Sequence, residues 1–342
     1  MSTGAALPPD GAGGLTWRPL EVADVTAWTR LQAAIEETDR PVERYTADDL
    51  EDELVKGSWK DASRDSAAGV DADGELRAAG LVESRPGDLR TIRAFCFGGV
   101  HPAWRRRGVG DALLAWQLSR GQEQIAAARA ARPDGDTVPA RVLLHADEHL
   151  ADRARLAARL GLRPVRYYVD MLRPLTVEGS PAVPDRPLGR GLELRPFSAE
   201  LDEPVRLAHN EAFAEHWGSE PRSAEDWSTW TTGHRDFRAD WSFVVLGGNE
   251  VAGYALSSAY EQEWAAHGYK QGWTNTLGVR PDWRGRGIAP ALLAASMRAF
   301  AASGMQYAGL DVDSENASGA LGLYERMGYT AQRRSVAYAL DV

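Results

Sequence analysis

The second half of the chain contains hydrophobic stretches of two kinds. Short stretches that are apolar throughout or at every second residue predict strands, and longer stretches with apolar residues three or four positions apart predict helices. Strands are predicted at residues 192–195, 242–246, 251–258, 273–279, 307–312 and 329–339, and helices at 201–215, 224–232, 288–301 and 317–327. This order indicates an α/β domain in which helices flank a mixed sheet.

One sequence pattern occurs twice. Residues 100–110 (VHPAWRRRGVG) match residues 279–289 (VRPDWRGRGIA), so that Arg105 lies 179 residues before Arg284. Shorter matches follow the same order along the chain: 17–20 with 194–197, 74–76 with 249–251, and 160–162 with 327–329. A repeat that keeps its order indicates two homologous halves.

The join between the halves is rich in residues that break regular structure. Residues 174–191 contain four prolines and three glycines and show no hydrophobic period, as is typical of a linker. We therefore expect an N-terminal domain at 15–173 and a C-terminal domain at 192–342. A length of 342 residues suits two domains.

Composition narrows the classes of partner. With 39 basic and 49 acidic side chains the formal charge is −10, which disfavours nucleic acid and anionic membrane surfaces as partners. The single cysteine, Cys96, cannot form an internal disulfide, and no apolar run reaches the roughly 18 residues of a membrane span. We expect a cytoplasmic protein. The seven histidines have no metal-ligand spacing, so we expect no metal.

The repeated turn contains the clearest chemical signal. In residues 279–289 a predicted strand ends, a turn with Gly285 and Gly287 follows, and a predicted helix begins. The N-terminus of a helix offers unpaired N–H groups and the positive end of the helix dipole, which favour an anion such as phosphate. Arg284 and Arg286 add charged donors. The alternative is an ordinary strand–turn–helix junction with solvated arginines.

Two motifs resemble those of the GNAT (GCN5-related N-acetyltransferase) superfamily. The run V-x-P-x-x-R-x-x-G-[IV]-[GA] in residues 279–289 is similar to its acetyl-CoA signature. Residues 310–329 are similar to its second motif, N-x-x-[AG]-x-x-L-Y-x-x-x-G-[FY]. The resemblance covers about 150 residues of the second half, and it implies two tandem GNAT domains with an α/β mixed sheet.

The resemblance also implies roles for individual residues, with acetyl-CoA as co-substrate. The backbone of the turn would hold the CoA pyrophosphate, through Arg284, Gly285, Arg286, Gly287, Ile288 and Ala289. The preceding strand end, Leu277, Gly278 and Val279, would pair with the pantetheine arm and polarise the thioester carbonyl. Asn316 would contact the arm, and Tyr324 would protonate the leaving thiolate. The alternative for Tyr324 is a core tyrosine, because it shares a helix face with Leu321 and Met327.

The first half retains the turn but not the second motif. Arg105, Arg107, Gly108 and Gly110 match turn residues of the second half, so the resemblance implies a second CoA turn. Alignment of Gly161 with Gly328, however, places Ala157 at the position of Tyr324 and His149 at that of Asn316. Asp111 replaces Pro290 and brings a carboxylate to the expected phosphates. We expect this half to be catalytically silent, and either structural or a vestigial CoA binder.

A base for the acceptor amine is expected, because an ammonium must lose a proton before it attacks. Glu261 and Glu263 follow the predicted strand 251–258 and are candidates; the alternative is a solvated surface run. Asp311 and Asp313 share one face of their strand, and Asp313 equally suits a helix cap. The acceptor cleft could include His216, Trp217, Trp227 and Trp230, although aromatic residues at helical spacing are more often core.

The function expected from these features is acetyl-CoA-dependent N-acetylation of a primary amine, on a small molecule or a peptide, by direct transfer in the C-terminal domain. Two alternatives stay open. A tandem chain of this length also resembles the mycothiol synthase family, which acetylates a cysteinyl amine, but that family has a glutamate where this chain has Trp273. The second alternative is a CoA-sensing module without catalysis, against which the presence of Tyr324 argues.

Overall fold

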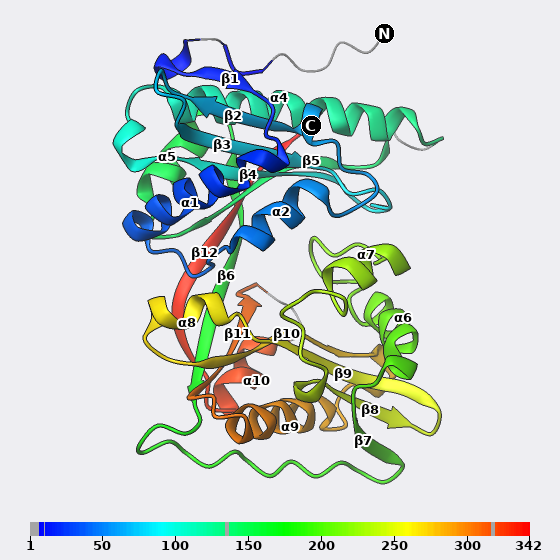
Figure 1. Cartoon of the computed structure of the whole chain (residues 1–342). Helices are drawn as coiled ribbons and strands as arrows, with labels where there is room; N and C mark the ends of the chain where they lie inside the picture. The colour runs from blue at the N-terminus through cyan, green and yellow to red at the C-terminus, as the bar shows by residue number, and fades with distance from the viewer. Residues whose placement is uncertain (1–6, 10, 134–136, 316–318) are drawn as a thin grey trace. The chain divides into compact units, whose positions relative to one another are not determined.

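The computed structural model describes residues 7–9, 11–133, 137–315 and 319–342 (Figure 1). Its internal contacts divide the chain into two compact units. Unit 1 comprises the chain through Arg166 together with Ser335–Val342, and unit 2 comprises Tyr167–Arg334. Each unit is an α/β domain built on one mixed sheet, which confirms the predicted fold class.

Unit 1 contains a six-membered run of strands in the order β1-β2-β3-β4-β5-β12, of which only β4 and β5 are parallel neighbours among the described pairs. Its elements are β1 (Thr16–Arg18), α1 (Val25–Asp39), α2 (Ala47–Val55), α3 (Ala62–Asp65), β2 (Ser66–Val70), β3 (Leu76–Glu83), β4 (Ile92–Val100), α4 (Val109–Ala130), β5 (Ala140–Asp147) and α5 (Ala151–Arg159).

Unit 2 has the strand order β6-β11-β10-β9-β8-β7, with β10 and β11 parallel. Its elements are β6 (Arg163–Pro174, entering from unit 1), β7 (Leu192–Pro196), α6 (Asp202–Ala212), α7 (Ala224–Trp230), β8 (Phe243–Gly247), β9 (Glu250–Ser258), α8 (Glu261–His267), β10 (Gln271–Val279), α9 (Ile288–Ala302), β11 (Tyr307–Asp313), α10 (Ala320–Arg326) and β12 (Thr330–Asp341, leaving for unit 1). Every strand and helix predicted for this half is present. Helix α8 was missed, because its N-cap, Tyr260, provides no capping side chain, whereas the equally short α7 begins after Ser223.

The two halves of the chain exchange their last strands. Strand β6 ends the first half, yet its residues 168–174 pair with β11 of unit 2. Strand β12 ends the second half, yet its residues 335–341 pair with β5 of unit 1. The expected domains at 15–173 and 192–342 therefore follow the sequence repeat, whereas the compact units differ from them by one strand each. A repeat records similarity of sequence and carries no information on which strand edges pair.

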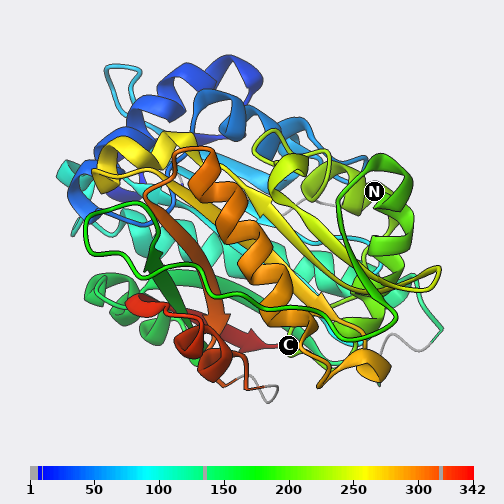
Figure 2. The same ribbon diagram turned by 90° about the horizontal axis from the view of Figure 1, so that it is seen from below.

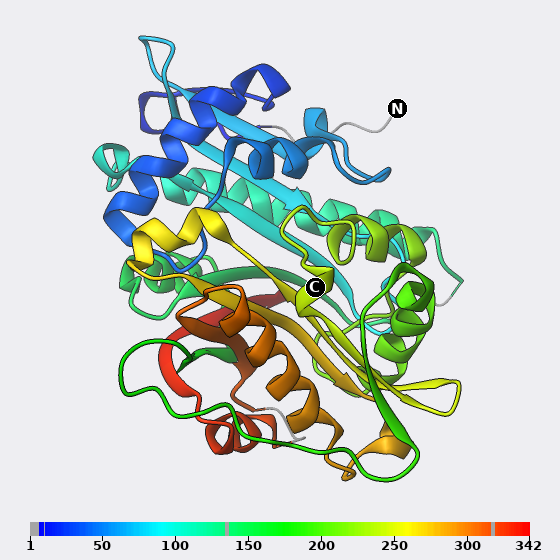
Figure 3. The same ribbon diagram turned by 60° about the horizontal axis from the view of Figure 1, so that its bottom comes forward.

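Helices cover both faces of each sheet. In unit 1 the neighbouring residues Ala78 and Ala79 belong to separate hydrophobic clusters, one formed with α4 and the other with α1 and α2. In unit 2, Val244 belongs to a cluster formed with α6 and α7, and the next residue, Val245, belongs to a cluster formed with α9. Figures 2 and 3 show α9 lying across the strands of unit 2. None of the helices in the described part of the chain has the length and apolar character needed to cross a membrane.

The segment between β6 and β7 lies along unit 2 and passes beside α9 (Figure 2). Leu175, Val183 and Leu188 of this segment pack against the hydrophobic clusters of that unit. Arg173, only 1% exposed, holds it in place. The guanidinium donates to the carbonyl oxygens of Met327 (2.8 Å), Pro181 (3.1 Å) and Ala182 (2.9 Å). Burial lowers the pKa of Arg173, as expected for a cation removed from water.

Replacement of Arg173 by alanine is expected to lower the free energy of unfolding by about 2–4 kcal/mol, because it leaves buried carbonyls without donors and opens a cavity. Urea unfolding followed by circular dichroism measures the loss. Arg163→Ala is the matched control, since Arg163 lies on the same strand with its side chain 75% exposed. Equal, small effects of both substitutions would contradict this account of Arg173.

Candidate functional site

The parallel strands β10 and β11 of unit 2 pair over only three residues and then separate. Gln271–Trp273 pair with Tyr307–Gly309, and no described residue pairs with β11 from further along β10. The register of β10 against β9 shifts between Thr274 and Thr276, a bulge that bends the strand at this point. The end of β10 therefore has one strand edge without a partner strand among the described residues, and an extended ligand can pair with such an edge.

Large side chains next to two glycines shape this opening. The ring of Trp273 lies where a Cβ on Gly309 would approach it to 2.4 Å, at the last residue pair before the strands part. A Cβ on Gly278 would lie 2.6 Å from the ring of Tyr254. The close approach of these rings requires glycine at both positions. Trp273 thus packs at the base of the opening, and Tyr254 supports the strand end that contains the predicted residues Leu277, Gly278 and Val279.

Tyr254 is itself fixed by His209, a pair that the sequence analysis missed. The Tyr254 hydroxyl lies 2.7 Å from His209 Nδ1, and both side chains are buried. Burial lowers the pKa of His209 to about 3, so the imidazole is neutral at physiological pH. His209 lies on α6, four residues after the buried Val205, so its position on the apolar helix face was the available signal.

The turn after β10 has the backbone shape that the sequence predicted. Gly285 and Gly287 have φ angles of 76° and 77°, in the left-handed region that favours glycine. Gly287 is the N-cap of α9, which begins at Ile288. The N–H groups of the first helical turn, with those of Ile288 and Ala289 among them, have no carbonyl partner within the helix. The turn therefore presents backbone donors at the positive end of a helix dipole.

The two arginines of the turn are held by their own surroundings. Arg284 donates to the carbonyl oxygens of Ala212 at 3.1 Å and Val279 at 3.4 Å, so its side chain fastens the turn to β10 and α6. The guanidinium of Arg286 stacks on Trp283 with 4.8 Å between its Cζ and the ring centre. Both guanidinium groups are thus engaged by neighbouring residues, and the backbone N–H groups at the start of α9 are the donors without a partner inside the helix.

Tyr324 lies on α10 and is 8% exposed. Its ring meets Tyr329 edge to face, with 6.0 Å between ring centres. Burial, with the nearby charge of Asp311, raises its pKa, so the phenol keeps its proton at neutral pH. No residue in the described part of the chain accepts a hydrogen bond from its hydroxyl. The second predicted contact, Asn316, lies outside the described residues.

The two candidate bases have different surroundings on α8. Glu261 has a 62% exposed side chain and forms an ion pair with Arg238 at 3.1 Å. Glu263 is only 5% exposed and accepts from Gln271 Nε2 at 3.4 Å. The Gln271 Oε1 atom is buried without a hydrogen-bond partner among the described residues, and it lies 3.2 Å from where a Cβ of Gly309 would be. Gln271 thus connects Glu263 to the point where β10 and β11 part.

The other acceptor-site candidates have mainly structural contacts. Asp313 is buried and accepts from the backbone N–H of Glu315 at 2.9 Å. It therefore stabilises a local turn and does not cap the following helix α10, whose N-cap is Gly319. Asp311 is exposed on β11. Trp227 is a core residue that donates to Asp202 Oδ1 at 2.7 Å and so joins α7 to α6.

Unit 1 repeats the turn, with Arg106 at the position of Gly285. Arg106 takes the left-handed conformation of Gly285, with φ 63°, and Gly108, with φ 79°, is the N-cap of α4. Arg107 stacks on Trp104 with 4.7 Å between its Cζ and the ring centre, as Arg286 does on Trp283. Arg105 forms two hydrogen bonds with the carboxylate of Asp39, at 2.7 and 2.9 Å. Gly110 follows in the first turn of α4.

The rest of the second motif is absent from unit 1. Ala157, at the position of Tyr324, is completely buried, so no proton donor occurs there. His149, at the position of Asn316, places Nε2 2.8 Å from the Asp39 carbonyl oxygen. Asp111 forms an ion pair with Arg159 at 2.6 Å, which offsets the carboxylate that was expected to repel phosphate.

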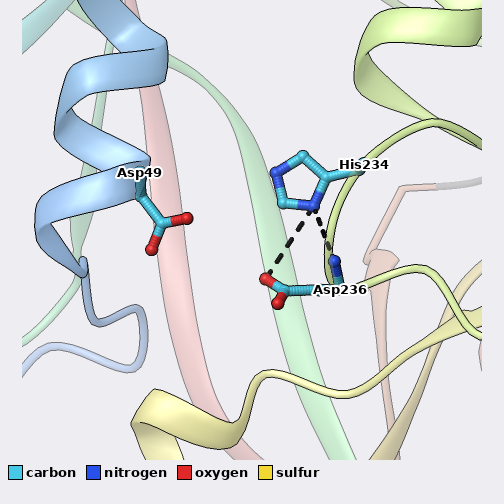
Figure 4. Close-up of side chains that lie close together, drawn as sticks. All are labelled: Asp49, His234 and Asp236. Atoms are coloured by element: carbon cyan, nitrogen blue, oxygen red, sulfur yellow. Dashed lines mark hydrogen bonds and ion pairs between the residues drawn. The ribbon is translucent and has the colours of Figure 1, made fainter.

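Unit 2 brings one histidine and one carboxylate close together. In unit 2, His234 Nδ1 lies 3.8 Å from Asp236 Oδ2 (Figure 4). Asp49, drawn in the same figure, belongs to α2 of unit 1, where it accepts from Thr46 Oγ1 at 2.7 Å. Taken by itself, neither unit brings three histidine, cysteine or carboxylate ligands together among residues 7–9, 11–133, 137–315 and 319–342.

Comparison with known proteins decides the family. The family model of the GNAT acetyltransferases matches residues 203–329. A mycothiol acetyltransferase of Thermobispora bispora is 31% identical over 245 residues, which cover 70% of this chain and 73% of its own. The chain belongs to the GNAT acetyltransferase family. A mycothiol acetyltransferase of Gordonia bronchialis is 30% identical over 286 residues, or 81% of this chain and 83% of its own.

Solved structures agree with this assignment. A GCN5-related N-acetyltransferase from Sphaerobacter thermophilus has a TM-score of 0.72 and 27% identity, and covers 98% of this chain and 97% of its own. A tandem GNAT protein of clavulanic acid biosynthesis has a TM-score of 0.62 at 17% identity, covers 96% of this chain and 98% of its own, and supports the tandem fold. The expectation of a GNAT acyltransferase with two such domains is confirmed.

The His209–Tyr254 pair gives this GNAT protein a specific acid sensitivity. The pKa of His209 is about 3 in the folded state, against about 6.5 when unfolded. Between these values only the unfolded chain binds the proton, so stability is complete above about pH 6.5 and falls as the pH is lowered. Linkage gives a loss of about 2 kcal/mol between pH 7 and pH 5.

Urea unfolding at pH 7 and pH 5 measures this loss of unfolding free energy. In His209→Leu the loss between the two pH values is expected to shrink by about 2 kcal/mol. Tyr254→Phe is the matched control: it removes the hydrogen bond, and thus about 1 kcal/mol at both pH values, but keeps the titrating imidazole. An unchanged pH dependence in His209→Leu would show that another group is responsible.

Proposed function

We propose that unit 2 transfers an acetyl group from acetyl-CoA directly to a primary amine. The observation that carries the proposal is the unpaired end of β10, which leads into a turn of backbone donors and lies in the same unit as the buried phenol of Tyr324. The family model matches residues of this unit, and GNAT proteins use acetyl-CoA. Unit 1 has the turn without the phenol, so we assign it no catalytic step.

Acetyl-CoA would bind through its pyrophosphate and its pantetheine arm. The N–H groups of Arg284–Ala289 would hold the pyrophosphate at the N-terminus of α9. The pantetheine arm would pair with the free edge of β10 along Leu277–Val279, as a peptide does when it adds to a sheet. A backbone N–H of this strand would then donate to the thioester carbonyl, where negative charge develops during attack.

Transfer requires the nitrogen to lose two protons and the sulfur to gain one. The first leaves the ammonium group before attack, and the second leaves the nitrogen after the C–N bond has formed and restores the phenol of Tyr324, so one proton is released to solvent overall. The neutral amine attacks the carbonyl carbon, the C–N bond forms, and the C–S bond breaks as the thiolate departs. Tyr324 would donate its hydroxyl proton to that sulfur, since burial keeps the phenol protonated at neutral pH. Because Tyr324 is buried, water would have little access to the departing thiolate.

Glu263 is the base that the structure favours over Glu261. It is buried, it lies on α8, the helix that precedes β10, and it accepts from Gln271, the first residue of β10. It would accept the ammonium proton, directly or through a water molecule. Glu261 is exposed and paired with Arg238, which suits a surface residue.

The names of the relatives favour one acceptor class, a cysteinyl amine. Several are named mycothiol acetyltransferases and match 70–81% of this chain, so a cysteinyl amine is the first acceptor to test. Trp273 occupies the position of the glutamate expected for that family, and here it packs on Gly309. A base at Glu263, two residues after the start of α8, would replace that glutamate from a neighbouring element.

Acid and base are tested together by the pH profile of acetyl transfer. Release of free CoA thiol from acetyl-CoA gives kcat, with S-methylcysteine amide, which keeps the cysteinyl amine but has no free thiol, and a panel of other primary amines as acceptors. Tyr324→Phe is expected to lower kcat by about 10²–10⁴-fold, the range of general acid catalysis. Glu263→Gln is expected to lower kcat similarly and to abolish the acidic limb of the profile.

Tyr329→Phe and Glu261→Gln are the matched controls, a buried neighbouring tyrosine and the exposed glutamate of the same helix. Both are expected to retain kcat within about threefold. Equal losses in Tyr324→Phe and Tyr329→Phe would remove Tyr324 from the acid role. Absence of thiol release above the hydrolysis background with every amine would favour a CoA-sensing module.

The assignment of catalysis to unit 2 is tested at the two turns. Valine at position 287 must adopt a left-handed conformation, a strain of about 1–2 kcal/mol that displaces the first N–H groups of α9. We expect Gly287→Val to raise the KM for acetyl-CoA by about tenfold or more. Gly108→Val imposes the same strain on unit 1 and is expected to leave turnover unchanged. A loss of turnover in Gly108→Val alone would move catalysis to unit 1.

A further inference from the structure

Unit 1 contains a cavity of about 690 Å³ that is separate from its CoA turn. Its walls are the end of α2 with the segment that leads into α3, the end of β3 with the turn that follows, and the second half of α4. Gln124 of its wall lies fifteen residues after Val109 at the turn, which is about 22 Å along a helix. The volume is in the range of small-molecule sites, about 300–1,000 Å³.

One side of this cavity is apolar. Trp59, Leu54, Leu81, Val82 and Pro86 line it, with three successive alanines of α4 at 126–128. The Trp59 indole N–H is buried and has no hydrogen-bond acceptor among the described residues. This wall can therefore cover a planar or aliphatic ligand body, and it offers one unsatisfied donor.

Ion pairs fill most of the polar side. Lys60, with a side chain 9% exposed, lies 3.2 Å from Glu53 and 3.7 Å from Glu83. Arg120 pairs with Asp65 at 2.7 Å and with Glu123 at 2.8 Å. These charges are already matched within unit 1, so they define the wall without demanding a ligand.

Three groups of the polar side are not matched in this way. Arg64 has no ion-pair or hydrogen-bond partner for its guanidinium within the described ranges, and Asp61 has no cationic partner there. Gln124 donates through Nε2 to the Val82 carbonyl at 3.1 Å, which leaves its buried Oε1 without a donor. The cavity thus offers one unpaired charge of each sign, one unsatisfied acceptor and, from Trp59, one unsatisfied donor.

We propose that this cavity binds a zwitterionic small molecule, an amino acid or a compound like it, with an ammonium group, a carboxylate and an apolar body. Arg64 would pair with the carboxylate, Asp61 and Gln124 Oε1 would accept from the ammonium group, and the body would lie against Trp59.

The probes are L-tryptophan, tryptamine, which lacks the carboxylate, and indole-3-propionate, which lacks the ammonium group. Calorimetric titration of the whole protein is expected to give one site for L-tryptophan with Kd between about 10 µM and 1 mM, and at least tenfold weaker binding of both analogues. Saturating acetyl-CoA should not change that Kd, because the turn is distant. Absence of binding to L-tryptophan up to about 10 mM, or equal binding of all three probes, would overturn the proposal.

Variants separate the two charges. Arg64→Ala is expected to weaken L-tryptophan about tenfold and leave tryptamine unchanged, and Asp61→Asn to weaken L-tryptophan and leave indole-3-propionate unchanged. Arg155→Ala is the matched control, an exposed arginine on α5 outside the cavity. Ala127→Phe fills the cavity from an exposed helix position and should abolish binding without disturbing the core. Acetyl transfer by unit 2 does not depend on this site, so a failure of either proposal is recognised independently of the other.

Discussion

The separation of β10 from β11 is the constraint on which the proposed chemistry of this protein depends. Two parallel strands that paired along their full length would leave no backbone edge for a ligand. The bulge between Thr274 and Thr276 bends β10 away after three residue pairs, and Trp273 packs on Gly309 at the point of divergence. After β10 the chain continues through the turn of Gly285 and Gly287 into α9. The free edge of β10 is therefore followed in the chain by the N-terminus of a helix.

The support for this path lies in buried groups that touch no ligand. Tyr254 fills the space beside Gly278 and is fixed by neutral His209, while Arg284 fastens the turn to Ala212 and Val279. Such contacts preorganise the site, because strand and turn need not rearrange when a ligand arrives. Arg173 likewise connects the segment between β6 and β7 to the end of α10, because it donates to carbonyl oxygens of both.

The two units share the turn, but only unit 2 has the tyrosine that we propose as the acid. Both have left-handed residues at equivalent turn positions and an arginine stacked on a tryptophan before the helix. Ala157 and His149 replace the tyrosine and asparagine, however, and the first unit has instead a cavity with unpaired groups at the opposite end of α4. A unit without a catalytic step, as we propose for unit 1, can stabilise its partner half or bind another ligand.

The sequence by itself determined the order of strands and helices, the tandem repeat, the glycine turn and the candidate phenol. These features depend on local rules: hydrophobic period, helix-capping geometry, and the need for glycine at positive φ. Helix α8 was not predicted because Tyr260, its N-cap, gives no capping signal.

Only the tertiary structure decided which strand edges pair, and so revealed that the halves exchange β6 and β12. It also distinguished buried Glu263 from exposed Glu261, two residues apart in sequence, and paired Asp111 with Arg159. Burial and long-range partners depend on what the rest of the chain places nearby, and no local pattern contains that information. The same holds for the cavity of unit 1, whose walls come from segments more than 60 residues apart in the sequence.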